Sequence, residues 1–112
     1  MAFHKKEEFG KKEQELAAIA KALSHPARIA ILKVLAQRNE CICGEIVEVL
    51  PLAQSTVSQH LKELKTAGLI EGTLEGPRSC YCINWKAFEK FSAAITSLFT
   101  NLKAKNEKAC NC

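Results

Sequence analysis

The sequence predicts a mainly α-helical domain that carries one small β-hairpin, with the element order ααααββα. Apolar residues recur at helical spacing in four segments before Gly68, a Gly-Pro turn separates two strand-like runs, and a longer apolar repeat follows. Of the 112 residues, 47% are hydrophobic and 25% are charged, which is ordinary for a globular protein. We expect a single domain over residues 1–102 and a flexible tail over 103–112.

The first two helices are expected over residues 14–23 and 26–38. Between them, Ser24 or His25 can cap a helix end, and Pro26 suits the first position of a helix. Their inward stripe is expected to contain Leu16, Ile19, Leu23, Ile29, Leu32, and Leu35 or Ala36.

A third, shorter helix is expected over residues 41–50, and a fourth over 56–67. Pro51 ends the third helix, Ser55 is a good N-cap for the fourth, and Gly68 supplies a C-terminal stop. The inward face of the fourth helix is expected to be Val57, Leu61 and Leu64.

A β-hairpin is expected from two strands, residues 69–75 and 78–84, and a last helix runs from Trp85 or Lys86 to about Leu102. The apolar residues of that helix follow a heptad seam, which would be half-exposed in a monomer. We therefore expect a homodimer whose interface is formed by the first and last helices. The seam contains Phe88, Phe91, Ile95, Leu98 and Leu102.

Two short helices joined by a tight turn and followed by a hairpin form a winged helix-turn-helix pattern, which is typical of binding to double-stranded DNA. The net charge of +4 is compatible with that partner. In this pattern the fourth helix reads bases, and Arg78 at the hairpin tip reaches the backbone or the minor groove. The outward, DNA-facing residues are expected to be Gln54, Ser55, Thr56, Ser58, Gln59 and Lys62, with His60 at their edge.

The six cysteines form three Cys-x-Cys pairs. The N-terminus has no signal peptide and no apolar run is long enough for a membrane helix, so we expect a cytoplasmic protein with reduced thiols. Reduced, paired thiols indicate metal binding or redox chemistry. A glycine-rich phosphate loop and a catalytic triad are both lacking, so we do not expect an enzyme. The pairs are Cys41 and Cys43, Cys80 and Cys82, and Cys110 and Cys112.

Three segments together resemble the ArsR/SmtB family of metal-responsive repressors, in the right order and over roughly residues 14–102. They are LSHPARIAIL at 23–32, ECICGEI at 40–46 and QSTVSQHLKELKTAGLI at 54–70. The resemblance implies a dimeric winged-helix repressor that releases operator DNA when it binds its inducer.

The sequence departs from the family's usual pattern in three places. Gly44 follows the second cysteine where the family often has Asp, the last helix carries no Asp or His for a zinc site, and cysteines in the wing are unusual. Matching the wing to the family places Tyr81 and Ile83 inward, so that Cys80 and Cys82 face outward.

Soft thiolates favour soft acceptors, so we expect As(III) as inducer: arsenite, antimonite or an organoarsenical. Helical positions 41 and 43 do not share a face, so binding one atom through both would distort the start of the third helix. We expect the third thiolate to come from the tail pair, Cys110 and Cys112, ahead of the wing pair. Cys80 and Cys82 then form a second site or a redox pair.

Three alternatives remain open at this stage. The same fold can serve a thiol-redox sensor or a cadmium or lead sensor, and the cysteines can also belong to a metal-buffering or thiol-exchange protein without DNA function. Arg28 is expected to hold the structure together more than to touch DNA phosphate.

Overall fold

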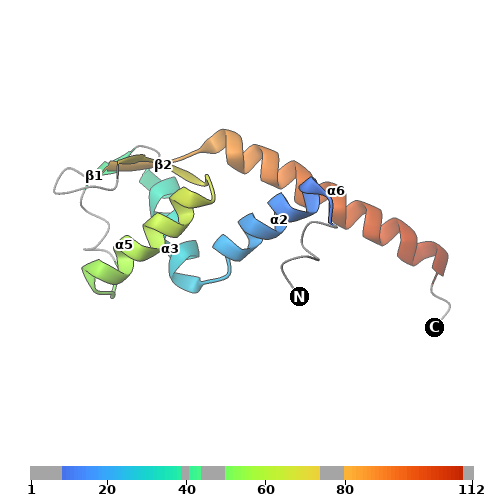
Figure 1. Ribbon diagram of the computed structural model, residues 1–112, viewed down its shortest axis with the longest axis horizontal. Helices are drawn as coiled ribbons and strands as arrows, with labels where there is room; N and C mark the ends of the chain where they lie inside the picture. Colours follow the sequence, from blue (N-terminus) through green and yellow to red (C-terminus); the bar gives the residue numbers. More distant parts are fainter. Residues whose placement is uncertain (1–8, 39–40, 44–49, 74–79, 110–112) are drawn as a thin grey trace.

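The structure is a computed structural model that describes residues 9–38, 41–43, 50–73 and 80–109. It confirms the mainly α-helical fold with a small hairpin and adds a short third strand (Figure 1). The elements are α2 (Lys11–Ala22), α3 (Pro26–Arg38), β1 (Ile42–Cys43), α5 (Gln54–Thr66), β2 (Ile70–Thr73), β3 (Cys80–Ile83) and α6 (Trp85–Ala109).

The first two helices form where the apolar spacing predicted them, and each has a local N-terminal cap. α2 begins at Lys11, where the Gly10 N–H donates to Glu13 Oε1 at 3.1 Å. Before α3, the Ala27 N–H donates to His25 Nδ1 at 3.0 Å, which confirms His25 as a cap residue.

The predicted third helix over 41–50 is wrong at its first residues, which form β1. This strand lies antiparallel to β3, and its two residues pair with Tyr81 and Cys80. Residues 44–49 lie outside the described part of the chain. The spacing of apolar residues reflects only the local preference for helix or strand. In the folded chain, the backbone N–H and C=O groups of this segment pair with a strand about forty residues later in the sequence.

Helix α5 begins slightly earlier than predicted. Its N-cap is Ala53, whose carbonyl accepts from the N–H groups of Thr56 and Val57 at 3.0 Å each. The prediction that Ser55 is the N-cap is therefore wrong, because this residue already lies inside the helix.

The chain turns from α5 into the sheet at Gly68, as predicted. Gly68 adopts φ +84°, a conformation that favours glycine, and the Leu69 N–H then donates to the Leu64 carbonyl at 3.0 Å. This turn directs the chain into β2.

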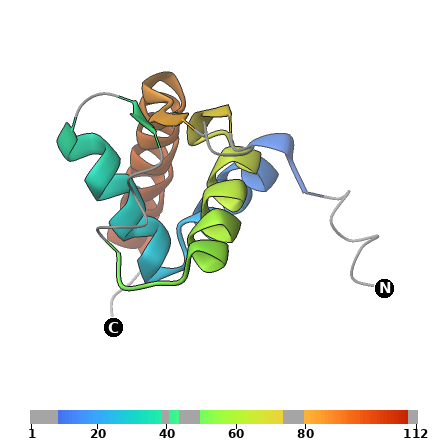
Figure 2. The same cartoon turned by 90° about the vertical axis from the view of Figure 1, so that its left-hand side faces the viewer.

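The sheet has the order β1-β3-β2, and both neighbouring pairs are antiparallel. On β3, Tyr81 and Ile83 are buried as predicted, while Cys80 and Cys82 are half-buried. α3 packs against both α5 and β3, and α5 packs against β2 (Figure 2). The buried core between them contains Ala22, Ile31, Leu32, Leu35, Val57, Leu61, Leu64, Leu69, Ile70, Tyr81 and Ile83.

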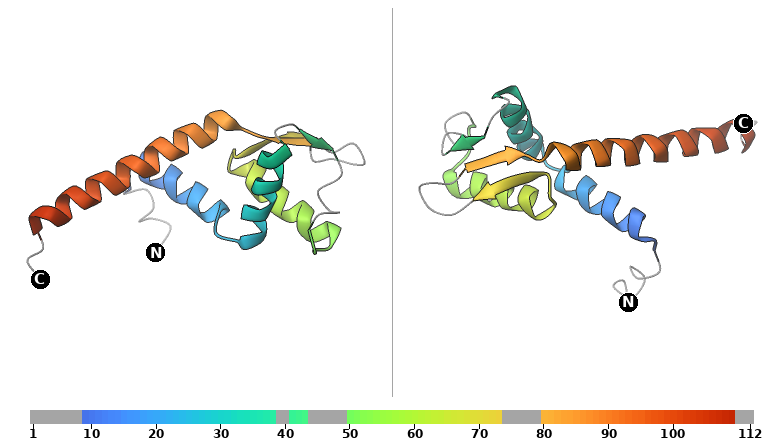
Figure 3. Two further views of the ribbon diagram at one scale, coloured as in Figure 1. Left: turned by 180° about the vertical axis from the view of Figure 1, so that it is seen from behind. Right: turned by 90° about the horizontal axis from the view of Figure 1, so that it is seen from above.

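Helix α6 starts at the sheet and extends well beyond the other elements, with α2 packed against it (Figure 3). It continues to Ala109, although the sequence predicted an end near Leu102. Leu98, Phe99 and Leu102 on its outer half are exposed, whereas Phe88 near its start packs on the core. Despite this length, none of the described helices is apolar enough to cross a membrane.

Candidate functional site

Helix α5 divides its residues sharply between two faces. Val57, Leu61 and Leu64 are buried, and they fix the helix on the core through their 3–4 residue spacing. The opposite face is polar and open to solvent, as a groove-reading helix requires. The exposed residues include Gln54, Ser55, Thr56, Ser58, Gln59 and Lys62, all placed outward as the sequence predicted.

The predicted wing contact, Arg78, lies outside the described residues. On the exposed face of α5, the Gln59 Nε2 group donates to Glu63 Oε1 at 3.4 Å. This is a long contact at the solvent-facing surface, so the amide can exchange it for another acceptor.

His60 differs from the sequence expectation, because it is buried and does not lie on the exposed edge of α5. Its side chain is only 8% exposed. The Arg28 Nε–H donates to His60 Nδ1 at 3.2 Å, and the His25 ring lies 4.4 Å away, centroid to centroid. His60 is therefore a neutral acceptor at Nδ1, and it belongs to the contact between α3 and α5.

The surroundings of His60 disfavour its charged form. Burial lowers its pKa below the ordinary value of 6.5, and the nearby His25 and Arg28 lower it further, while Glu63 acts in the opposite direction. Protonation at Nδ1 would also remove the acceptor that Arg28 uses.

Arg28 joins three elements, which matches the structural role expected for it. Besides His60, its Nη1 group donates to the backbone carbonyls of Ala22 at 3.2 Å and of Lys21 at 3.4 Å. These carbonyls lie at the end of α2, and the Lys21 carbonyl also accepts from the N–H and the Oγ–H of Ser24. One guanidinium therefore fixes the end of α2, the start of α3 and the middle of α5.

The first and second cysteine pairs meet at the sheet. Cys41 and Cys82 form a disulfide with Cα atoms 4.4 Å apart, and Cys80 is also disulfide-bonded. Cys43 lies opposite Cys80 in the backbone register. The expectation of reduced, unlinked thiols is not met, because the pairing of β1 with β3 brings Cys41, the residue before β1, within bridging range of Cys82.

From the sequence, the wing pair ranked second, behind the tail pair, as the partner of Cys41 and Cys43. The third thiolate was expected from Cys110 or Cys112, which lie outside the described residues. A signal was nevertheless present, since two segments with identical Cys-x-Cys spacing match each other in an antiparallel pair of strands. In the described ranges, and with these disulfides formed, no group of three or more Cys, His, Asp or Glu is arranged around a metal position.

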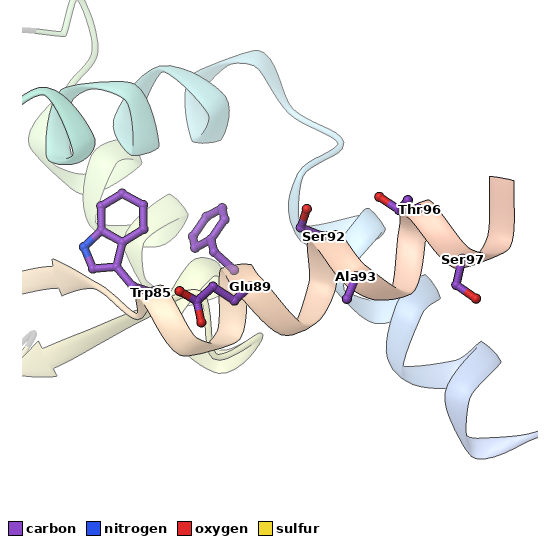
Figure 4. Close-up of a pocket in the computed structure, with 7 residues that line it drawn as sticks. Trp85, Glu89, Ser92, Ala93, Thr96 and Ser97 are labelled. Atoms are coloured by element: carbon purple, nitrogen blue, oxygen red, sulfur yellow. The ribbon is translucent and has the colours of Figure 1, made fainter. Parts of the chain in front are cut away.

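A separate shallow hollow of about 770 Å³ lies along α6 (Figure 4). The Trp85 and Phe88 rings, 6.1 Å apart, form its apolar end. Among the described residues that line it, Glu89 is the one with a carboxylate. Its lining consists of Trp85, Phe88, Glu89, Ser92, Ala93, Thr96 and Ser97.

Comparison with known proteins gives consistent matches. The sequence model described as "Bacterial regulatory protein, arsR family" matches residues 25–71, which span α3 to the start of β2. The HTH-type transcriptional regulator YgaV of Escherichia coli is 31% identical over 77% of this chain and 87% of its own length. The arsenical resistance operon repressor of Staphylococcus xylosus is 28% identical over 88% of this chain and 97% of its own.

The fold is similar to that of a solved ArsR-like transcriptional regulator from Rhodococcus sp. RHA1. The TM-score is 0.67 at 22% identity, over 89% of this chain and 97% of the other. That likeness supports the arrangement of helices and hairpin described above. From its sequence matches and its winged helix-turn-helix architecture, the chain belongs to the ArsR/SmtB family of DNA-binding transcriptional regulators.

Proposed function

We propose that the chain is a homodimeric repressor that holds operator DNA with α5 and releases it when cysteine thiolates bind trivalent arsenic. The observation that carries the DNA-binding part is the two-sided burial of α5, with apolar residues in the core and amide, hydroxyl and ammonium groups outward. The meeting of Cys41 with Cys82 at the base of the wing supports the thiol-controlled part.

The exposed face of α5 supplies the two kinds of contact that operator binding needs. The side-chain amide of Gln59 can donate to and accept from one adenine in the major groove, and this contact distinguishes base pairs. Lys62 and the free N–H groups at the start of α5 suit phosphates, which set position and affinity without selecting a sequence.

The exposed apolar half of α6 supports the proposed dimer. Leu98, Phe99 and Leu102 are 37%, 55% and 54% exposed, and they lie on a helix that extends beyond the rest of the chain (Figure 3). A soluble domain rarely leaves such a row of side chains in water. Pairing would bury them and present two copies of α5 to operator half-sites about one helical turn apart.

The position of Cys41 supports coupling between the thiols and DNA. The residue lies between α3 and α5 in sequence and beside the wing strand β3 in space. A ligand that pulls these segments together changes the placement of α5 relative to the wing. Coupling of about 1–3 kcal/mol would weaken operator binding about 5- to 150-fold.

The test is a titration of the reduced protein on its promoter DNA, followed by fluorescence anisotropy. Arsenite should release the DNA at about one equivalent per protomer, with a parallel titration by cadmium showing whether a divalent soft metal acts in the same way. Stable DNA binding in the presence of arsenite would refute arsenic as the inducer and leave the operator-binding role intact.

The Cys41–Cys82 disulfide favours a second candidate, release by oxidation. Here peroxide would convert the two thiols to a disulfide with loss of two protons and two electrons, and the bridge would hold β1 against β3. Release by peroxide in the absence of arsenite, reversed by dithiothreitol, would support this candidate. Unchanged DNA binding after complete oxidation would exclude it.

A further inference from the structure

The clustering of cysteines between β1 and β3 has a consequence for where arsenic binds. Cys41 is exposed, Cys80 and Cys82 are half-buried, and Tyr81 between them is buried. Cys80 and Cys82 are alternate residues of one strand and so share a face. Their face is the one that Cys41 reaches, because Cys41 and Cys82 are bonded directly.

We propose that Cys41, Cys80 and Cys82 of one protomer form a single arsenic site, so that the wing strand, and not the C-terminal tail, completes it. The inference rests on the proposed function and deepens it by naming the thiolates. Three sulfur donors on one side of a small sheet suit an acceptor that takes three ligands in a pyramid and keeps a lone pair on its open side.

The sheet itself keeps these residues together when the thiols are reduced. β1 is paired to β3 through its backbone, in a register that places Ile42 opposite Tyr81. β3 is in turn paired to β2 along its whole length. The donors are therefore arranged by strand pairing as well as by the disulfides, which lowers the ordering cost of binding.

The binding step is a ligand exchange without a change in oxidation state. Arsenite enters as As(OH)₃; three As–S bonds form, three As–O bonds break, and the three thiol protons leave with the hydroxide groups as three waters. Cys41 and Cys82 are joined by a disulfide, and Cys80 is disulfide-bonded as well. A disulfide has no thiol to give, so each of these disulfides must first be reduced, with two electrons and two protons from a dithiol such as dithiothreitol. Oxidised protein therefore cannot bind arsenic at this site.

The proposed site explains why a strand at residues 42–43 suits arsenic binding better than a helix would. In a helix, alternate residues face different directions, so binding would have required the helix to unwind. In the structure, Ile42 and Cys43 pair as β1 with β3, and Cys41 just before them is bonded to Cys82, so the Cys-x-Cys segment already lies against the wing. Arsenic would then link the segment before α5 directly to the strand that leads into α6, within one protomer.

The test measures arsenic binding and DNA release separately, on full-length reduced protein. Arsenite is added, unbound arsenic is removed by gel filtration, and bound arsenic is measured by elemental mass spectrometry. The wild type and the double variant C110S/C112S should each retain about one arsenic per protomer. C41S, C80S and C82S should each lose at least about 90% of the bound arsenic, while circular dichroism and operator binding show that they remain folded.

Opposite results would overturn the proposal. Loss of arsenic in C110S/C112S, or full retention in C82S, would place the third thiolate elsewhere, and an arsenite response of DNA binding would still stand. Conversely, arsenic bound through Cys41, Cys80 and Cys82 without release of DNA would keep the site and refute the proposed induction.

A second experiment compares arsenic binding by the oxidised and the reduced wild-type protein. Wild-type protein is oxidised with peroxide, and the linked peptides that contain Cys41 and Cys82 are identified by mass spectrometry. This form should bind less than about a tenth of the arsenic bound by reduced protein, with full recovery after dithiothreitol treatment. Equal binding by both forms would show that these sulfurs are not the ligands.

Discussion

At the scale of single residues, helix α5 places an exposed and a buried polar side chain next to each other in the sequence. Gln59 is exposed, whereas the next residue, His60, is buried against Arg28 and His25. The exposed amide is available to DNA, and the buried imidazole holds the helix at the correct place on α3. Substitutions at the two positions should therefore affect different measurements.

The first prediction concerns His60 and pH. Because its folded pKa lies below the unfolded value of 6.5, the unfolded chain takes up the proton more readily. The stability associated with neutral His60 is fully present above about pH 6.5 and is lost as the pH falls through that value towards the folded pKa. Urea unfolding between about pH 7.5 and pH 5.5 should show this decline in the free energy of unfolding.

The matched variant for this prediction is His60→Asn, whose side-chain oxygen can accept from Arg28 in place of Nδ1 but does not titrate. The neighbouring groups that face His60, namely His25, Arg28 and Glu63, remain unchanged. The difference between the two curves of unfolding free energy against pH then gives the contribution of His60 alone. Parallel curves for wild type and variant would show that the loss of stability at low pH does not come from His60.

The second prediction concerns Gln59 and Lys62. Gln59→Ala should reduce discrimination between operator and random DNA by about 1–3 kcal/mol, because it removes a base contact. Lys62→Ala should weaken binding to both DNAs similarly and lower the salt slope by about 1, because it removes a phosphate contact. Anisotropy titrations at several salt concentrations measure both effects. An unchanged specificity ratio in the Gln59 variant would remove it from the base-reading set.

At the scale of elements, the hairpin depends on the close approach of its two strands. Gly72 on β2 has φ +130°, and an added Cβ there would collide with the backbone carbonyl of Cys80 on β3. The strand that carries the wing cysteines can therefore pair with β2 in this register only when position 72 lacks a side chain.

This close approach leads to a third prediction. Gly72→Ala should lower the free energy of unfolding by at least about 2 kcal/mol, since it combines a backbone collision with an unfavourable φ. Gly68→Ala is the control, because its φ is also positive but an added Cβ meets nothing within 4 Å. The control should lose only about 1 kcal/mol. Urea denaturation compares the two, and equal losses would show that the collision is relieved by a small strand movement.

At the scale of the whole molecule, the long α6 creates an asymmetric shape. The chain measures 56 × 35 × 25 Å, and the outer half of α6 contacts few other elements (Figure 1). The compact part contains the core and α5, while the projecting part exposes apolar side chains. This division places the proposed DNA-reading surface and the proposed dimer interface on different parts of the chain, so that each can be tested without disturbing the core.

The fourth prediction tests that division. The double variant L98E/L102E places charges in the exposed seam, and it should convert a dimer to a monomer in size-exclusion chromatography with light scattering. Operator affinity should fall strongly because two half-sites are no longer bound together. Lys103→Glu, an exposed change next to the seam, serves as the charge control. A variant that remains dimeric would place the interface elsewhere.

Much of the architecture follows from local sequence patterns. Apolar spacing in α3 and α5 identified both helices and the buried residues Val57, Leu61 and Leu64. The glycine turn after α5 was predictable as well, and so was the half-exposed seam of α6. These features depend on residues within a few positions of each other, because helix geometry repeats over 3.6 residues and glycine acts on its own backbone.

Other features were decided only by the tertiary structure. The burial of His60 depends on Arg28 and His25 from an earlier part of the chain, and the strand at 42–43 depends on pairing with β3. The bond between Cys41 and Cys82 joins residues 41 positions apart. The sequence determined by itself the approximate positions of α2, α3, α5 and α6 and the apolar face of α5, because those properties are local. It did not determine which distant groups meet, since burial and strand pairing are properties of the assembled chain.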